Sequence, residues 1–358
     1  MTILYILVAI LLLGILVTVH EFGHYIAARM TGIEVMEFAI GFGPKLFGWT
    51  GKSGTAFSLR LIPMGGYCAF YGEDDAEGKH VDDPRSYSRQ SVWKRMFSVL
   101  MGPAMNFILA FVVVVAFYWI GGIAELTGYE PYIAEVAGAG PAYNAGLRDG
   151  DVIESVNGVN VLDGTTDTLL GAIAAYKEGD APLAMVVRRG DTTFETEMTP
   201  FWDAELERFR VGVSIGAYAL TETRRASFVE SVKEGWNWCV YAGGVIITSL
   251  KDLVTTGEGL DQTAGPVGVV TMVSQEVQQY GFEAFINLLV VISINLGIMN
   301  LLPIPGLDGS RFLFNVVEAV RGKPVPAQKE AIIHLCGYVL LIGLMIFFTF
   351  KDVMRLFQ

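Results

Sequence analysis

The chain has 358 residues, of which 52% are hydrophobic and only 17% are charged, and its mean hydropathy is +0.46. This composition excludes an ordinary soluble protein of this length and favours a membrane protein. The formal net charge of −12 argues against nucleic acid as a partner. The three cysteines are far apart, so they predict neither a disulfide framework nor a thiolate metal site.

Four uncharged runs have lengths typical of transmembrane helices, which need about 17–25 residues: 3–19, 96–124, 284–307 and 331–350. The first run has no basic segment before it and no small-residue cleavage site after it, so we interpret it as a retained helix and not as a signal peptide. A shorter apolar stretch at 236–250 is flanked by charges. It is typical of an interfacial helix, with a fifth span as the alternative.

Basic residues predict the orientation of these helices. Seven of them flank helix ends on one side: Arg29, Lys94, Arg95, Arg311, Arg321, Lys323 and Lys329. The positive-inside rule then places 31–95 and 311–330 in the cytoplasm, and both termini and the segment 125–225 outside. That segment is acidic and has the character of a soluble domain. We expect a multi-pass protein of a bacterial inner membrane with this domain in the periplasm.

The first apolar run leads into the sequence His-Glu-Phe-Gly-His, 20–24. Residues i and i+4 share a helix face, so His20 and His24 can bind one metal ion, with Glu21 beside them to activate a water molecule. Two helix histidines without metal are the alternative, but ionisable residues at membrane depth are costly and usually functional. His20 lies about 25 Å along the helix from Ile3, near the cytoplasmic edge of the bilayer.

A catalytic zinc ion needs a third protein ligand and an open position. The remaining histidines are His80, in a polar loop, and His334, near the start of the last helix. Asp308 follows the third apolar run and reaches the same membrane edge as His20 and His24. A plain Asp-Gly turn is its alternative interpretation, but the shared depth favours Asp308 as the third ligand.

The HEFGH sequence, combined with NLLPIPGLDG at 300–309, resembles the site-2 protease family of intramembrane zinc metalloproteases, and most closely its bacterial regulator of sigma-E protease-like branch. Four further segments agree with the family: GFGPKLFGW at 41–49, LIPMGGYCAF at 61–70, GPAMNF at 102–107 and TAGPVGVV at 263–270. The resemblance implies that His20, His24 and Asp308 bind Zn2+ and that Glu21 is the general base. It also implies that Asn295 and Asn300 lie near the substrate, although hydrogen bonding between helices remains an alternative for both.

A substrate segment must be extended before it can be cleaved. Residues 56–72 alternate and are rich in strand formers around Gly65 and Gly66, which predicts a hairpin whose edge pairs with the substrate. A plain cytoplasmic loop is the alternative. Gly102 permits close helix packing, and Asn106 can bond to a neighbouring helix. We include Gly65, Gly66 and Asn106 with Asn295 and Asn300 as candidate substrate-binding residues.

The segment between the second and third predicted spans reads as strands at 132–136 and 151–156, an Asn-Gly turn at 157–158, a helix at 167–176 and two later strands. Residues 139–161 resemble the bacterial PDZ signature. The length admits one PDZ domain, where relatives often carry two. It could bind a chain end by strand addition or act as a size filter that excludes intact receptors, and the filter needs no ligand.

The fold class predicted is therefore a polytopic α-helical membrane protein with four transmembrane helices, a membrane-associated β-hairpin region and one inserted periplasmic PDZ domain of α+β type. The expected function is zinc-dependent cleavage of transmembrane segments in single-pass proteins already shortened by another protease, such as anti-sigma factors or remnant signal peptides. A non-catalytic PDZ scaffold and a metal transporter are the alternatives. The expected divisions are 1–30, 31–95, 96–124, 125–225, 226–282 (interfacial helix and connection), 283–310 (third span with the LDG motif), 311–330 (cytoplasmic loop) and 331–358.

Overall fold

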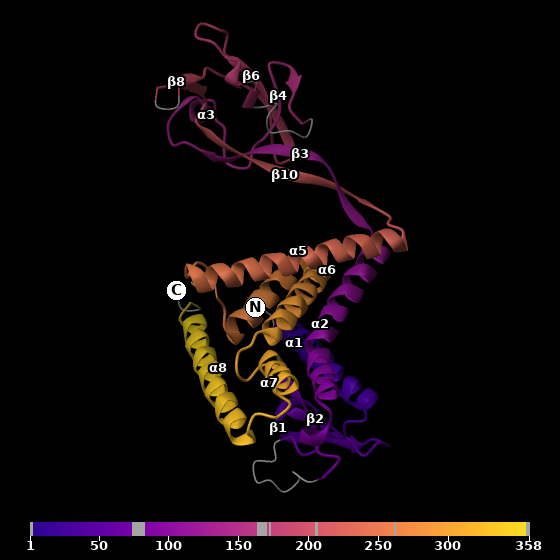
Figure 1. Ribbon diagram of the computed structural model, residues 1–358. Helices are drawn as coiled ribbons and strands as arrows, with labels where there is room; N and C mark the ends of the chain where they lie inside the picture. Colours follow the sequence, from indigo (N-terminus) through magenta and orange to yellow (C-terminus); the bar gives the residue numbers. More distant parts are fainter. Residues whose placement is uncertain are drawn as a thin grey trace. The chain divides into compact units, whose positions relative to one another are not determined.

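The computed structural model describes residues 3–73, 83–162, 170–171, 173–204, 207–260 and 263–355. The chain forms two compact units, one built from 1–120 with 227–358 and the other from 121–226. Long helices dominate the first unit, and strands dominate the second (Figure 1).

Four helices in the described part of the chain are long and apolar enough to cross a membrane, as predicted. They are α1 (Ile3–Thr31), α2 (Val92–Gly121), α6 (Pro266–Leu301) and α8 (Ala327–Arg355). A buried apolar cluster joins α1 to α6 through Leu12, Leu16, Val273 and Leu289. This packing fixes the helix that carries His20 against the helix that leads to Asp308.

The third span begins close to its predicted start and differs at its end. Helix α6 contains a non-helical residue, Gly281 (φ 69°, ψ −142°), so a separate helical segment precedes the apolar one, which begins near the predicted residue 283. The predicted span over 283–310 is wrong at its end, because α6 stops at Leu301. Leu302 is extended (φ −65°, ψ 142°), as expected for the residue before Pro303.

Asp308 begins a new helix, α7 (Asp308–Arg321), instead of ending the third span. The predicted cytoplasmic loop at 311–330 is therefore mostly helical. Apolar and charged residues separate onto opposite faces of α7, which is typical of a helix packed on one side.

The predicted interfacial helix is longer than the apolar stretch at 236–250. Helix α5 (Phe228–Thr255) begins after Ser227, whose side chain accepts a hydrogen bond from the Glu230 amide. Ala242 packs with Val290 and Ile294 of α6. In Figure 1, α5 runs crosswise to α2 and α6. It is not among the four helices that qualify as spans in the described residues.

The segment after α1 forms two long antiparallel strands, β1 (Val35–Thr50) and β2 (Ala56–Phe70), followed by a short 3-10 helix, η1 (Tyr87–Arg89). The predicted hairpin within 56–72 is wrong in its turn: Gly65 and Gly66 lie inside β2, and the chain reverses between β1 and β2. Residues 37–40 pair with 56–59 and also with 66–69. The strands therefore bend, and Gly65 takes the positive φ of 97° that this bend requires.

A polar cluster holds these bent strands together. The Glu37 carboxylate accepts hydrogen bonds from Ser58 (2.6 Å), Arg60 (2.8 Å) and Tyr67 (2.8 Å). Burial alone would raise the pKa of Glu37, but these three donors outweigh it and lower the pKa below its ordinary value.

The second unit is built around an antiparallel sheet with strand order β10-β3-β4-β6-β7, and β5 pairs with β4. The predicted strands at 132–136 and 151–156 lie in β3 and β4, and the Asn157–Gly158 turn joins β4 to β5 with both residues at positive φ. Of the predicted helix at 167–176, residues 167–169 and 172 lie outside the described residues, and 170–171 and 173–174 are helical. The elements are β3 (Ile123–Val136), α3 (Pro141–Asn144), β4 (Val152–Val156), β5 (Val159–Asn160), β6 (Leu183–Arg189), β7 (Thr192–Met198), β8 (Phe201–Asp203), β9 (Arg208–Arg210) and β10 (Val213–Arg224).

Candidate metal centre

The structure brings His20, His24 and Asp308 together, although 284 residues separate His24 from Asp308 in the sequence. The Asp308 Oδ2 atom lies 3.0 Å from His20 Nε2 and 3.3 Å from His24 Nε2. The two Nε2 atoms are 3.3 Å apart. Both histidines are buried, at 7% and 8% exposure. One ligand atom from each residue therefore faces a common point.

Neighbouring groups fix which imidazole nitrogen of each histidine faces that point. His24 Nδ1 donates to the Ser98 carbonyl oxygen at 2.9 Å, so Nε2 carries the lone pair in the neutral ring. His20 Nδ1 lies 3.1 Å from the amide of the buried Asn106, whose Oδ1 has no hydrogen-bond partner among the described residues. With that amide turned so that Oδ1 faces His20, Asn106 accepts the Nδ1 hydrogen, and His20 Nε2 also carries a lone pair.

The resulting arrangement fits a cation. Two imidazole lone pairs and a carboxylate oxygen converge, and Asp308 Oδ2 is buried without a well-aligned hydrogen bond among the described residues. Three acceptors at this spacing repel one another unless a positive ion or a proton lies between them. Two imidazoles and one carboxylate are ligands that a catalytic zinc ion takes, with a fourth position left open. The residues present therefore fit zinc.

Helix α2 packs tightly against the histidines through the GPAMNF segment. A Cβ atom at Gly102 would lie 2.3 Å from His24 Nε2, which is closer than any real contact. On α1, a Cβ at Gly23 would lie 2.1 Å from the Met101 carbonyl oxygen. Gly102 and Asn106 are four residues apart, so one face of α2 contacts both histidines. The Asn106 amide lies against His20 of α1, which confirms the predicted hydrogen bond to a neighbouring helix, and its role in substrate binding stays a prediction.

A short turn between α6 and α7 presents Asp308. Pro303 and Pro305 lack backbone donors, which prevents α6 from continuing. Gly306 has a φ of 99°, and its amide donates to His334 Nδ1 at 3.2 Å. His334 thus holds this turn and is not among the three converging groups. The first turn of α7 favours a negative charge, which suits Asp308 at its start.

The backbone of β2 passes beside Glu21. A Cβ atom at Gly66 would lie 3.3 Å from Glu21 Cγ and 2.7 Å from the Ala39 carbonyl oxygen. Glycine at this position lets the strand approach both the general-base candidate and its neighbouring strand. Gly65 is close to the ring of Phe42 instead.

The other predicted site residues are more dispersed. Asn295 is exposed on α6 and Asn300 is half-buried near its end. His80 lies outside the described residues. Cys68 is near the site, but burial, with the Glu21 and Glu73 carboxylates, raises the pKa of its thiol and disfavours a thiolate ligand.

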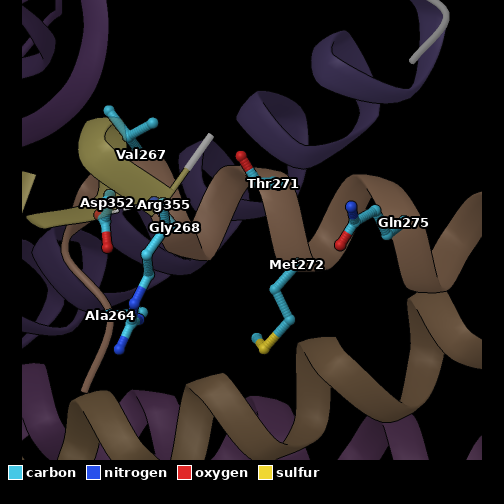
Figure 2. Close-up of a pocket in the computed structure, with 8 residues that line it drawn as sticks. All are labelled: Ala264, Val267, Gly268, Thr271, Met272, Gln275, Asp352 and Arg355. Carbon is cyan, nitrogen blue, oxygen red and sulfur yellow. Dashed lines mark hydrogen bonds between the residues drawn. The ribbon is translucent and has the colours of Figure 1, made fainter. Parts of the chain in front are cut away.

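A pocket of about 230 Å³ lies elsewhere, between α6 and α8 (Figure 2). There the Asp352 carboxylate accepts a hydrogen bond of 2.7 Å from the Gly268 amide near the start of α6. None of the predicted site residues lines this pocket. Its lining residues are Ala264, Val267, Gly268, Thr271, Met272, Gln275, Asp352 and Arg355.

Sequence reasoning missed the groups that orient the ligands. The Ser98 carbonyl has no sequence signal, because a backbone acceptor is present at every residue. The ion pairs of α7, Arg311 with Glu73 and Arg95 with Glu318, join residues far apart in the chain. The close approach of Gly102 to His24 does have a sequence signal, since the small residue in GPAMNF predicts close helix packing.

Comparison with known proteins covers nearly the whole chain. Residues 8–344 match the profile of Peptidase family M50. The chain is 32% identical to the regulator of sigma-W protease RasP of Bacillus subtilis, over 97% of this chain and 98% of that protein. It is 30% identical to the zinc metalloprotease RasP of Bacillus licheniformis, with the same coverage. A solved PDZ domain of an SdrC-like protein from Listeria monocytogenes covers 25% of this chain and 90% of that domain, at 20% identity and a TM-score of 0.22, which carries no argument about fold.

Proposed function

Because this chain belongs to peptidase family M50 and is an intramembrane zinc metalloprotease, we propose that His20, His24 and Asp308 are its zinc ligands and Glu21 its general base. The convergence of three buried acceptors beside Glu21 carries this proposal. The family assignment favours the protease over the scaffold and the transporter.

Each of these residues would have a separate role in the hydrolysis reaction. Zinc, when bound, lowers the pKa of a bound water towards about 7 and polarises the scissile carbonyl group. Glu21 takes the proton of the attacking water and delivers it to the leaving amine nitrogen. Asn106 and the Ser98 carbonyl hold the two histidine rings in the tautomer that leaves Nε2 available. Asn300 is our candidate donor to the developing oxyanion.

The bent strands supply a binding mode for the substrate. A cleavable peptide must be extended, and β2 passes beside Glu21 at the half-buried Gly66. We infer that the substrate adds as a strand along the 66–70 part of β2, which places its backbone near the metal centre. Main-chain pairing would give this site little dependence on side-chain sequence.

We further propose that the metal centre lies near the cytoplasmic face of a bacterial inner membrane, with the second unit in the periplasm. The basic residues around 94–95 and 311–329 support this orientation. The second unit is proposed to be a PDZ domain that restricts access to substrates already shortened by another protease. The relative named for sigma-W regulation supports anti-sigma factors as one substrate class.

The test uses Glu21→Gln in the full chain with a labelled single-pass substrate. We expect cleavage to fall by at least 100-fold, within the about 10²–10⁴-fold range of general-base catalysis, while bound zinc stays at the parent level. Glu34→Gln is the matched control, because Glu34 follows α1 but is half-exposed, and its ion pair with Arg85 is long, at 3.8 Å. Unchanged cleavage in Glu21→Gln with zinc retained would refute Glu21 as the base.

A further inference from the structure

Helix α7 must be held accurately, because Asp308 is its first residue and no side chain caps its start. Among the described residues, two ion pairs connect α7 to other elements: Arg311 pairs with Glu73, and Glu318 pairs with Arg95 at 2.5 Å. The Glu73 and Arg95 side chains are only 13% and 11% exposed. These are partly desolvated pairs, for which loss of one partner costs more than at an open surface.

The two pairs differ in their distance from the metal centre. Arg311 follows Asp308 by three residues, so both project from neighbouring positions on the first turn of α7. Glu318 follows Asp308 by ten residues, about 15 Å along the helix. Only the Arg311 pair is therefore placed to control the direction of the Asp308 carboxylate.

Glu73 connects this helix to the substrate strand. It comes three residues after the end of β2, and its carboxylate also accepts a weak hydrogen bond of 3.4 Å from the Phe70 amide. Upstream in the same strand, Gly66 lies against Glu21. One ion pair thus joins the helix that begins at Asp308 to the strand that passes the general base.

We propose that Glu73 and Arg311 are positioning residues, whose ion pair sets the Asp308 carboxylate relative to His20 and His24 and the β2 strand relative to Glu21. The proposal rests on the ligand set given under Proposed function. Neither side chain is proposed to contact the reacting atoms. The role of the pair is to hold α7 and β2, which are far apart in the sequence, in a fixed position relative to each other at the site.

The experiment measures zinc affinity by chelator competition on the purified full chain, so that its readout does not depend on activity. Arg311→Gln and Glu73→Gln should each weaken zinc binding about tenfold or more, the effect typical of groups that orient metal ligands. The double variant should be no weaker than the single variants, because both remove the same interaction. Arg311→Lys keeps the charge and should retain most of the affinity.

Glu318→Gln is the matched control, since it breaks an ion pair on the same helix but far from Asp308. Its zinc affinity should stay within about twofold of the parent. Equal loss in Arg311→Gln and Glu318→Gln, additive losses in the double variant, or parent affinity in both single variants would overturn the proposal. His20→Ala separates the two claims: if it retains full zinc affinity, the ligand set itself fails, whatever the ion-pair variants show.

Discussion

The two units bury different kinds of residue. The core of the second unit is apolar, with Ile133, Val156 and Val187 at 0% exposure, and its buried Asp151 is neutralised by an ion pair with Arg189 at 2.7 Å. In the first unit, the deeply buried residues include His20, His24 and Asn106, which come from two apolar helices. Buried apolar residues therefore stabilise one unit, whereas buried polar residues form the proposed metal centre of the other.

Removal of a ligand should produce the largest effect. Asp308→Ala removes one of three converging acceptors, so we expect loss of stoichiometric zinc and of cleavage, measured by metal analysis and a substrate assay. Asp191→Ala, in an exposed turn of the second unit, is the control and should keep both. A parent zinc content in Asp308→Ala would remove Asp308 from the ligand set.

The addition of a single methyl group on α2 should have the next largest effect on zinc binding. Gly102→Ala places a Cβ 2.3 Å from His24 Nε2, so the ring or the helix must move. We expect zinc affinity to fall by about 10–100-fold, as for other disturbances of ligand orientation. Gly14→Ala on α1 has nothing within 4 Å of the new Cβ and should leave zinc affinity unchanged. Equal behaviour of the two variants would show that α2 does not constrain the site.

Loss of the Asn106 acceptor should weaken zinc binding less than Gly102→Ala does. Asn106→Leu keeps a similar size but cannot hold the His20 Nδ1 hydrogen, so we expect about a tenfold weaker zinc affinity in the chelator assay. Asn237→Leu on the exposed face of α5 is the comparison and should have no effect on zinc. Unaltered zinc affinity in Asn106→Leu would return Asn106 to the helix-packing or substrate roles considered from the sequence.

A core substitution in the second unit should have the opposite pattern, with a loss of stability and no loss of zinc. Ile153 is 1% exposed in its core, so Ile153→Ala should destabilise that unit by about 2–5 kcal/mol, seen by amide hydrogen exchange. Zinc content should not change, because the ligands all lie in the first unit. A loss of zinc in this variant would break the proposed separation of packing from chemistry.

The smallest effect concerns the Glu37 cluster. Hydrogen bonds lower the pKa of the folded-state Glu37, so its stabilisation is present above the unfolded pKa of about 4.3 and is lost as pH falls through the folded value. Glu37→Gln should therefore unfold more easily than the parent at pH 7, and the difference should shrink on acidification. A constant difference across that pH range would show that the Glu37 charge contributes nothing.

Much of the first unit followed from the sequence. Four apolar runs predicted four long helices, and the HEFGH spacing predicted that His20 and His24 share a face, because both signals depend only on local periodicity. Asp308 was reached through its position after the third run. The structure brings it to the histidines, even though that run ends as a helix at Leu301 and Asp308 belongs to the next helix.

The errors arose where long-range pairing overrides local pattern. Gly65–Gly66 is a strong turn signal, yet the pairing of 37–40 with two parts of β2 places both glycines within a strand. For Asn106, the GPAMNF pattern predicts a bond to a neighbouring helix, but nothing local specifies that His20 is the partner. Likewise, the Glu73–Arg311 pair joins residues 238 positions apart, which no local reasoning could connect.

The most direct test of the metal centre is X-ray absorption at the zinc edge of the purified full chain. We expect two imidazole nitrogens at about 2.0–2.1 Å and a carboxylate oxygen at about 2.0–2.2 Å from the zinc ion. In the spectrum of any zinc that remains bound to His24→Ala, one of the two imidazole nitrogens should be missing. A sulfur ligand at about 2.3 Å, which would implicate Cys68, or an unchanged spectrum in His24→Ala would contradict the assignment of His20, His24 and Asp308.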